Sequence, residues 1–281
     1  MWKVIRMLDK ELALRFLFDV LWDEEFGAFR ESYDPEYLER FWYSDNSLAW
    51  ILMQRYDKEK AKRIEENFTR MMGYPPPFPH FGWDRWCVLV GDTESFTQAF
   101  LKPNFENWMC YSDLLSLQYL YYHYTGNIEW KNRVYAMLLS QLTEEGLIVD
   151  RTSLEPPLPD GCAPYKLSLL TIVSILHNRY DVAKRCLDHI GNAQVKDKNR
   201  IDYGGIRIAI WKSEWGPVPD HLISSVTNDI RCNCETQVLS ILAQDAYDDA
   251  TWIKNLPSIP LIILALETGR KTGLSGKALS F

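Results

Sequence analysis

The chain has few cysteines, no excess of positive charge and no long apolar run, and each absence excludes a class of protein. Six cysteines in 281 residues are too few for a disulfide scaffold, and their spacing matches no zinc ribbon. The 31 Lys and Arg residues against 38 Asp and Glu residues give a net charge of −7. Such a charge would repel a phosphate backbone, so we expect no nucleic-acid partner.

No segment has the length and apolarity that a membrane span requires. The most apolar stretch, residues 256–266, contains two prolines and is about half of the ~20 residues that a spanning helix needs. Residues 1–12 contain charges too early for a secretory signal. We therefore expect a soluble, cytoplasmic protein without a membrane partner.

Aromatic residues, in contrast, are abundant. The chain contains 11 Trp, 15 Tyr and 12 Phe residues within an otherwise ordinary globular composition of 47% hydrophobic and 25% charged residues. So many large rings need either a large core or an aromatic-lined site.

A repeated pattern indicates helical hairpins. Four runs contain no Asp, Glu, Lys or Arg and are typical of helices surrounded by protein: residues 46–54, 114–122, 167–176 and 236–244. Each is followed by a Tyr and then by a residue suited to capping the next helix, at Tyr56-Asp57, Tyr124-Thr125, Tyr180-Asp181 and Tyr247-Asp248. The helices that follow are charged on one face; residues 58–70 carry eight charges.

The alternation of inner and outer helices predicts an all-α fold, an α/α toroid of about four to five helical hairpins that uses residues 1–281 as one domain. Helices at about residues 8–22 and 259–270 would form the seam. An open helical solenoid is the alternative, but it would have more regular periods and shorter loops.

The long connections, residues 73–110, 143–164 and 192–232, would gather at one rim of the toroid. We expect short β-hairpin elements there, in residues 146–152 and 200–213, with Gly204-Gly205 at a bend. The rim is rich in rings, which form either a small core of the loops or a surface for sugars or another flat ligand. The candidate binding residues in these loops are Trp83, Trp86, Trp211, Trp215 and His80.

Three carboxylates stand where inner helices begin: Asp45, Asp113 and Glu235. An acid in a first helical turn can simply cap the helix. Three acids on neighbouring helix starts would also converge on a central cavity, where paired carboxylates perform acid/base catalysis. Their separation would distinguish a retaining glycosidase pair, at about 5–5.5 Å, from an inverting pair, at about 6.5–9.5 Å.

Cysteines occur at the same helix starts, at Cys110, Cys162, Cys232 and Cys234. With His80 or His221 they could form a zinc site. Cysteine is also one of the residues most often buried as a small apolar side chain, and we expect this second role, with no metal and no cofactor.

The starts at residues 43–45 (Tyr-Ser-Asp), 111–113 (Tyr-Ser-Asp) and 233–236 (Asn-Cys-Glu-Thr), with the uncharged helices and long loops, resemble the α/α-toroid superfamily. The chain looks like a reduced version of the six-hairpin glycosidase-like proteins, similar to unsaturated glucuronyl and rhamnogalacturonyl hydrolases and sugar epimerases.

This resemblance implies a carbohydrate-active enzyme, a glycoside hydrolase or sugar epimerase, acting on a small-molecule or oligosaccharide substrate. Asp45 and Asp113 would be the acid/base pair and Glu235 a third candidate, and Tyr43 and Tyr111 would contact substrate. Two alternatives stay open: a non-catalytic module that binds a glycan, peptide or protein, and a zinc-dependent toroid enzyme of the cyclase or prenyltransferase type.

Overall fold

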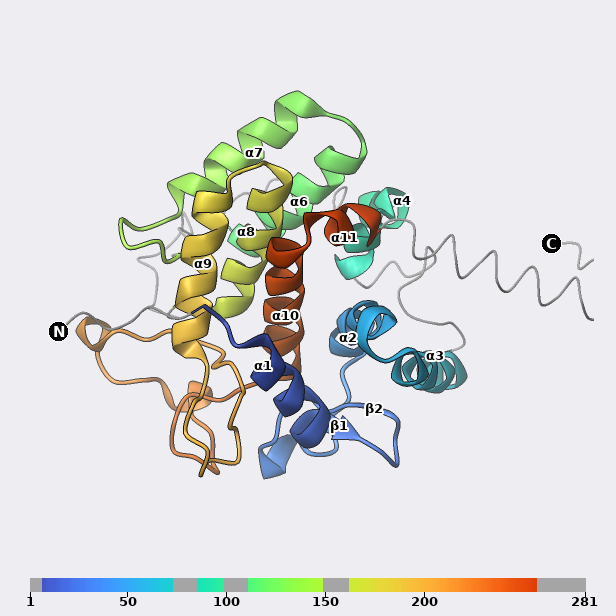
Figure 1. Ribbon diagram of the computed structural model, residues 1–281, viewed down its shortest axis with the longest axis vertical. Coiled ribbons are helices and arrows are strands. Elements are labelled where there is room, and N and C mark those ends of the chain that lie inside the picture. The colour runs from blue at the N-terminus through green and yellow to red at the C-terminus, as the bar shows by residue number, and fades with distance from the viewer. Residues whose placement is uncertain (1–6, 73–84, 99–110, 149–161, 257–281) are drawn as a thin grey trace, which may run out of the picture.

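The computed structural model describes residues 7–72, 85–98, 111–148 and 162–256, which are mostly helical (Figure 1). This confirms the all-α prediction. The longer described helices are α1 (Lys10–Phe16), α2 (Tyr43–Tyr56), α3 (Lys58–Met72), α6 (Ser112–Tyr124), α7 (Ile128–Ser140), α8 (Pro164–Leu176), α9 (Tyr180–Ala193) and α10 (Cys234–Asp248). The shorter ones are η1 (Leu17–Leu21), η2 (Pro35–Tyr37), η3 (Arg85–Val90), α4 (Thr93–Phe96), η6 (Ser213–Trp215), η7 (Asp220–Leu222) and α11 (Ala250–Asn255).

The four expected hairpins are α2–α3, α6–α7, α8–α9 and α10–α11, and the two helices of each contact one another. The uncharged runs lie in α2, α6, α8 and α10, whose side chains are buried along most of their length. Helix α3 buries only one stripe, formed by Ala61, Ile64 and Phe68, and exposes its charges. Since a charge cannot be buried cheaply without a partner, charge content alone separates inner from outer helices.

The predicted capping residues are correct at one of the four turns. Asp57 caps α3, because its side chain accepts from the backbone N–H of Lys60 at 3.0 Å. Thr125 instead ends α6, and after Gly126, which adopts a positive φ of 73°, Asn127 caps α7. Asp249 caps α11 in place of Asp248.

The Tyr180-Asp181 turn is likewise displaced from its prediction. Helix α8 ends at Leu176, and Tyr180 begins α9. The carboxylate of Asp181 accepts from the guanidinium of Arg179 at 2.9 and 2.7 Å.

The contacts between inner helices follow chain order and return to the start. Helix α6 contacts α8, α8 contacts α10, and α10 contacts α2, while η3 contacts both α2 and α6. Helices α8 and α10 lie side by side in Figure 1. The helices α3, α7, α9 and α11 each pack on the inner helix that precedes them in the chain.

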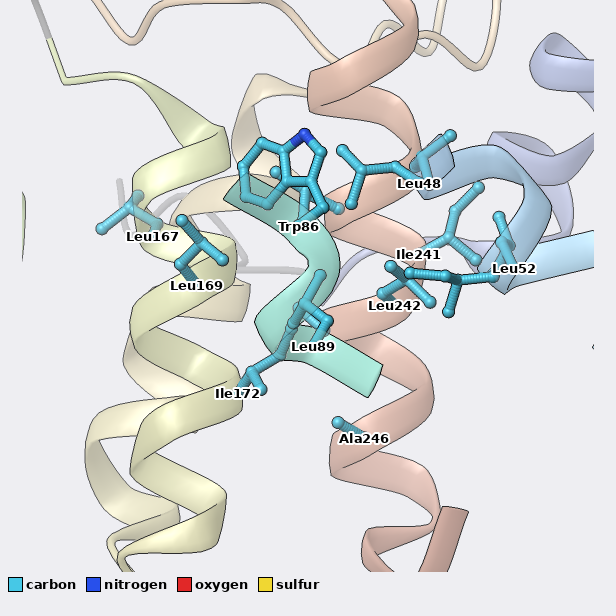
Figure 2. Close-up of a cluster of buried hydrophobic side chains, with 14 of the residues drawn as sticks. Leu48, Leu52, Trp86, Leu89, Leu167, Leu169, Ile172, Ile241, Leu242 and Ala246 are labelled. Atoms are coloured by element: carbon cyan, nitrogen blue, oxygen red, sulfur yellow. The ribbon is translucent and has the colours of Figure 1, made fainter. Parts of the chain in front are cut away.

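The core lies between the inner helices and is filled by η3. Figure 2 shows Trp86 and Leu89 of η3 lying among side chains of α2, α8 and α10. These neighbours are Leu48, Leu52, Leu167, Leu169, Ile172, Ile241, Leu242 and Ala246, all fully buried. Aliphatic groups and one indole thus occupy the space at this level, so any polar site lies nearer the ends of the helices.

The expected β-hairpins in the long loops were largely wrong. Within residues 200–213 the structure has isolated bridges, from Ile206 to Gln194, Arg207 to Cys232 and Ile210 to Cys162. Of residues 146–152, Ile148 bridges to Leu142, and residues 149–152 lie outside the described ranges. The paired strands that are described, β1 (Trp22–Asp23) and β2 (Ala28–Phe29), lie elsewhere; they are antiparallel, with Trp22 opposite Phe29.

Gly204 lies in a turn, as predicted, and is also required there by close packing. Its φ is 94°, and a Cβ atom at this position would lie 2.3 Å from the backbone oxygen of Leu12 in α1. Only glycine combines this conformation with so close an approach.

Two further predictions concern the helices expected at about residues 8–22 and 259–270. The expected first helix is found as α1 continued by η1, with Asp9 capping α1 through the N–H of Leu12. The helix expected at 259–270 lies outside the described residues. Among the helices of the described ranges, none has the length and apolarity to cross a membrane.

Candidate functional site

One guanidinium joins two of the predicted carboxylates. Arg85, the first residue of η3, donates from Nη1 to Oδ2 of Asp113 at 3.4 Å and from Nη2 to Oε1 of Glu235 at 2.9 Å. Asp113 is in the first turn of α6 and Glu235 in the first turn of α10. The three residues come from separate elements, and we call them, with Tyr165 and Lys166 of α8, the Arg85 site.

Glu235 is free to serve in this site because another residue caps its helix. Asn233 precedes α10, and its side-chain oxygen accepts from the backbone N–H of Thr236 at 3.0 Å. The capping role considered for Glu235 is therefore already filled.

Asp113 uses one of its carboxylate oxygens for the pair of contacts in the site. Oδ2 accepts from Arg85 and from the hydroxyl of Tyr165, both at 3.4 Å. The side chain is only 8% exposed, and among the described residues Oδ1 has no hydrogen-bond partner. A buried acceptor without a partner costs free energy, about 1–3 kcal/mol.

The electrostatics of the site favour a protonated form of Glu235. Burial raises the pKa of this carboxyl above its ordinary value, and the negative charge of Asp113 raises it further. The charges of Arg85 and Lys166 act in the opposite direction but do not cancel the effect of burial. A carboxyl with a raised pKa beside a second carboxylate is the arrangement that acid/base enzymes use.

The shared guanidinium also limits how far apart the two carboxylates lie. Its two terminal nitrogens are about 2.3 Å apart in a rigid planar group, so the contacted oxygens lie within about 9 Å of each other. This limit is compatible with the separations of both retaining and inverting glycosidase pairs.

The third predicted acid, Asp45, lies in the first turn of α2 and is buried. Its charge, with burial as the larger cause, raises the pKa of the Cys234 thiol, the residue before Glu235. Asp45 therefore lies near the start of α10, while Arg85 brings together Asp113 and Glu235.

The structure corrects the predicted role of Trp86. Its side chain is fully buried beneath the Arg85 guanidinium, 4.6 Å from the ring centroid, and so it presents no face to a ligand. Tyr43 is half-buried and packs edge-to-face on Phe68 of α3, with 5.5 Å between the ring centroids. Both rings stabilise contacts between elements.

Other predicted rings are accessible. Tyr111, directly before α6, is 42% exposed. Trp211 and Trp215 are half-buried and meet edge-to-face at 5.7 Å. Trp211 follows Ile210, whose bridge to Cys162 places this loop beside the start of α8. His80 and Trp83 lie outside the described residues.

The prediction of the site missed three residues, Arg85, Tyr165 and Lys166, and counted Trp42 among the rings of the rim without making it a candidate binding residue. Two of them had a signal in the sequence. Arg85 is the only Lys or Arg between Arg70 and Lys102, and Lys166 is the only charged residue in residues 164–176. A cation in the first turn of a helix opposes the helix dipole, so its presence in an uncharged helix indicates another role.

Trp42 is the most exposed aromatic ring near these helix starts, at 51%. It precedes α2, and its indole N–H donates to the carboxylate of Glu31. The backbone oxygen of Glu31 in turn accepts from the N–H of Cys234 at 2.8 Å. The ring is therefore held close to the start of α10.

The cysteines do not form a metal site in the part of the chain that is described. Cys162, Cys232 and Cys234 are buried, and burial raises the pKa of the Cys232 and Cys234 thiols, which disfavours the thiolate that binds zinc. Within the described ranges, no group of three or more His, Cys, Asp or Glu residues could hold a metal ion. His221 is exposed, and Cys110 lies outside these ranges.

Comparisons with protein-family models, with curated proteins and with solved structures give no match for this chain. The functional argument therefore depends on the residues of the Arg85 site and the rings around it.

Proposed function

We propose that this chain is a carbohydrate-active enzyme, a glycoside hydrolase or sugar epimerase, with Asp113 and Glu235 as its acid/base pair. The observation that carries the proposal is the bridging of the buried carboxylate of Asp113 and the half-buried carboxylate of Glu235 by Arg85, at distances of 3.4 and 2.9 Å. Two acids of like charge beside one cation are costly to stability, and active sites are among the places where such arrangements occur.

The proposal includes an α/α toroid as the fold. Contacts that run from α2 through η3, α6, α8 and α10 back to α2 support a closed arrangement of inner elements. With α3, α4, α7, α9 and α11 each contacting the preceding inner element, five hairpins would form the toroid. In this arrangement the starts of the inner helices converge on one rim, above the apolar centre filled by η3.

The two carboxylates have different roles in the proposed reaction. Glu235, whose pKa is raised mainly by burial, would donate a proton to the leaving oxygen as general acid. Asp113 would use its unpartnered Oδ1 to accept a proton from water or a sugar hydroxyl. This assignment replaces the pair Asp45 and Asp113 expected from the resemblance, because Arg85 joins Asp113 to Glu235.

The exposed rings support a carbohydrate as the substrate. Trp42 and Tyr111 immediately precede the helices that carry Asp45 and Asp113 and are the exposed aromatic side chains at these helix starts. A flat aromatic face beside convergent polar groups fits the apolar face and the hydroxyls of a sugar ring.

A panel of oligosaccharides and sugars tests this function. We expect the wild-type protein to convert at least one member, and Glu235→Gln to reduce the rate by about 10²–10⁴-fold, the usual contribution of a general acid. Glu66→Gln, on the solvent side of α3 and 63% exposed, is the matched control and should retain full activity.

Two outcomes would overturn the proposal. Saturable binding without any product would indicate the non-catalytic binding module instead. Full activity in Glu235→Gln, with an unchanged melting temperature, would show that the carboxylate pair does not carry the reaction.

A further inference from the structure

The position of Arg85 is fixed from three directions. Nη1 contacts Asp113, Nη2 contacts Glu235, and the planar face lies 4.6 Å from the ring centroid of Trp86. Trp86 is in turn held by the packed core shown in Figure 2. The guanidinium therefore rests on a rigid support, and its two terminal nitrogens set where the carboxylate oxygens lie.

Burial strengthens the electrostatic interactions between Arg85 and the two acids. The Asp113 side chain is 8% exposed and that of Glu235 is 19% exposed, so little water screens their repulsion. Without a cation between them, the like charges of the two carboxylates would repel each other with little screening. The charge of Arg85 and its hydrogen bond act to lower the pKa of Glu235, against the larger effect of burial.

We propose that Arg85 is the positioning residue of this pair: it fixes the orientation of Asp113 and Glu235 and supplies the positive charge between them. Arg85 does not itself take part in bond making. It acts through Glu235, which it contacts more closely, and through Oδ2 of Asp113, which it occupies together with Tyr165 so that Oδ1 is left for the ligand. The kinetic consequence rests on the proposed function, whereas the effect on proton binding does not.

Lys166 also acts on Glu235, more weakly than Arg85 does. Its ammonium lies 5.7 Å from the ring centroid of Tyr165. An ammonium is a compact charge without the fixed, planar pair of donors of a guanidinium, so Lys166 is expected to contribute mainly charge.

A carboxyl titration tests the proposal without any substrate. Protein labelled with ¹³C at the glutamate side-chain carboxyl is titrated by NMR, and the Glu235 signal is identified by its loss in Glu235→Gln. In Arg85→Met we expect the Glu235 midpoint to move to higher pH, because removal of the cation disfavours the ionised form. Lys166→Met should move it in the same direction by a smaller amount.

Arg133→Met is the matched control for the loss of a stacked arginine. Arg133 lies over Trp130 of α7, 4.7 Å from the ring centroid, and no ion pair is described for it. This variant should leave the Glu235 midpoint unchanged. Arg85→Gln, which keeps hydrogen-bond donors without the charge, replaces Arg85→Met if the latter does not fold by circular dichroism.

The kinetic arm separates charge from orientation. Arg85→Lys should bring the Glu235 midpoint back toward the wild-type value but leave kcat below wild type by about tenfold or more, since the shorter lysine lacks the two separate, planar donor nitrogens that contact Asp113 and Glu235. A Glu235 midpoint in Arg85→Met that is unchanged or moves to lower pH would overturn the proposal. If no sugar is converted, the proposed function fails, while the titration still decides the role of Arg85.

Discussion

Replacing Asp245 tests how much a buried ion pair contributes to the free energy of unfolding of this fold. Asp245 is fully buried near the end of α10, where it accepts from Lys10 of α1 at 2.9 Å and from the Tyr56 hydroxyl at 2.6 Å. Asp248, one turn further on, accepts from the same Lys10 ammonium at 3.0 Å but is 43% exposed. The two aspartates thus share the Lys10 donor at similar distances, but Asp245 is buried and has two further partners, the Tyr56 hydroxyl and Arg55, whose Nε lies 3.7 Å from its Oδ2.

The expected magnitudes differ several-fold. Asp245→Asn removes the carboxylate charge that Lys10 and the Tyr56 hydroxyl contact. Breaking a buried ion pair in this way costs about 3–5 kcal/mol of unfolding free energy. Because Lys10 is 22% exposed and keeps Asp248, we expect a loss near the lower limit, about 3 kcal/mol. Asp248→Asn should cost less than about 1 kcal/mol, as exposed pairs do.

Urea unfolding followed by circular dichroism measures both losses, provided that the slope with denaturant is unchanged. Equal losses for the two variants, or a loss below 1 kcal/mol for Asp245→Asn, would refute the argument. The pair matters for the architecture because it joins α1 and α2 to the end of α10.

Three further predictions concern packing and pH. Trp86→Ala should cost about 3–5 kcal/mol of unfolding free energy in a urea titration, whereas Trp42→Ala should cost under about 1 kcal/mol. Trp42→Ala should instead weaken sugar binding measured by calorimetry. A small loss of stability with weakened binding in Trp86→Ala would restore Trp86 as a binding residue. Gly204→Ala should lower the melting temperature more than Gly126→Ala, since both have positive φ but only Gly204 approaches Leu12, and equal shifts would contradict this packing. Burial, with the charges of Lys131 and Arg179, lowers the pKa of His177. The neutral ring therefore contributes stability above pH about 6.5, and this contribution is lost as the pH falls. His177→Gln should flatten the pH dependence of the melting temperature between pH 7.5 and 5, and an unchanged slope would contradict this prediction.

Much of the helical arrangement could be predicted because it depends on local charge content. The uncharged runs of α2, α6, α8 and α10 had to be buried, and residues 58–70 had to keep one face in water. Turns were less predictable, since Thr125 and Asp248 have capping chemistry but the neighbouring Asn127 and Asp249 occupy the capping positions. The sequence pattern looks the same whether a helix begins at one residue or one or two residues later, so it does not fix which residue caps the helix.

The site was only partly predictable, because its central contact is long-range. Arg85 meets residues 28 and 150 positions further along the chain, and no spacing rule connects them. The acids could be found from their positions at the starts of helices. Which two of them share a cation depends on where η3, which carries Arg85, packs among the inner helices. Trp86 was misassigned for the same reason, since composition does not distinguish a ring that fills the centre from one at the surface.

The most direct test of the central claim is a double-substitution comparison of Asp113→Asn and Glu235→Gln on the best substrate from the panel. If the two carboxylates act as one acid/base pair, each single variant loses most of the activity and the double variant loses little more, because residues that act as a unit are not additive. Losses that multiply in the double variant would show that the two residues act independently, and would contradict the pairing through Arg85.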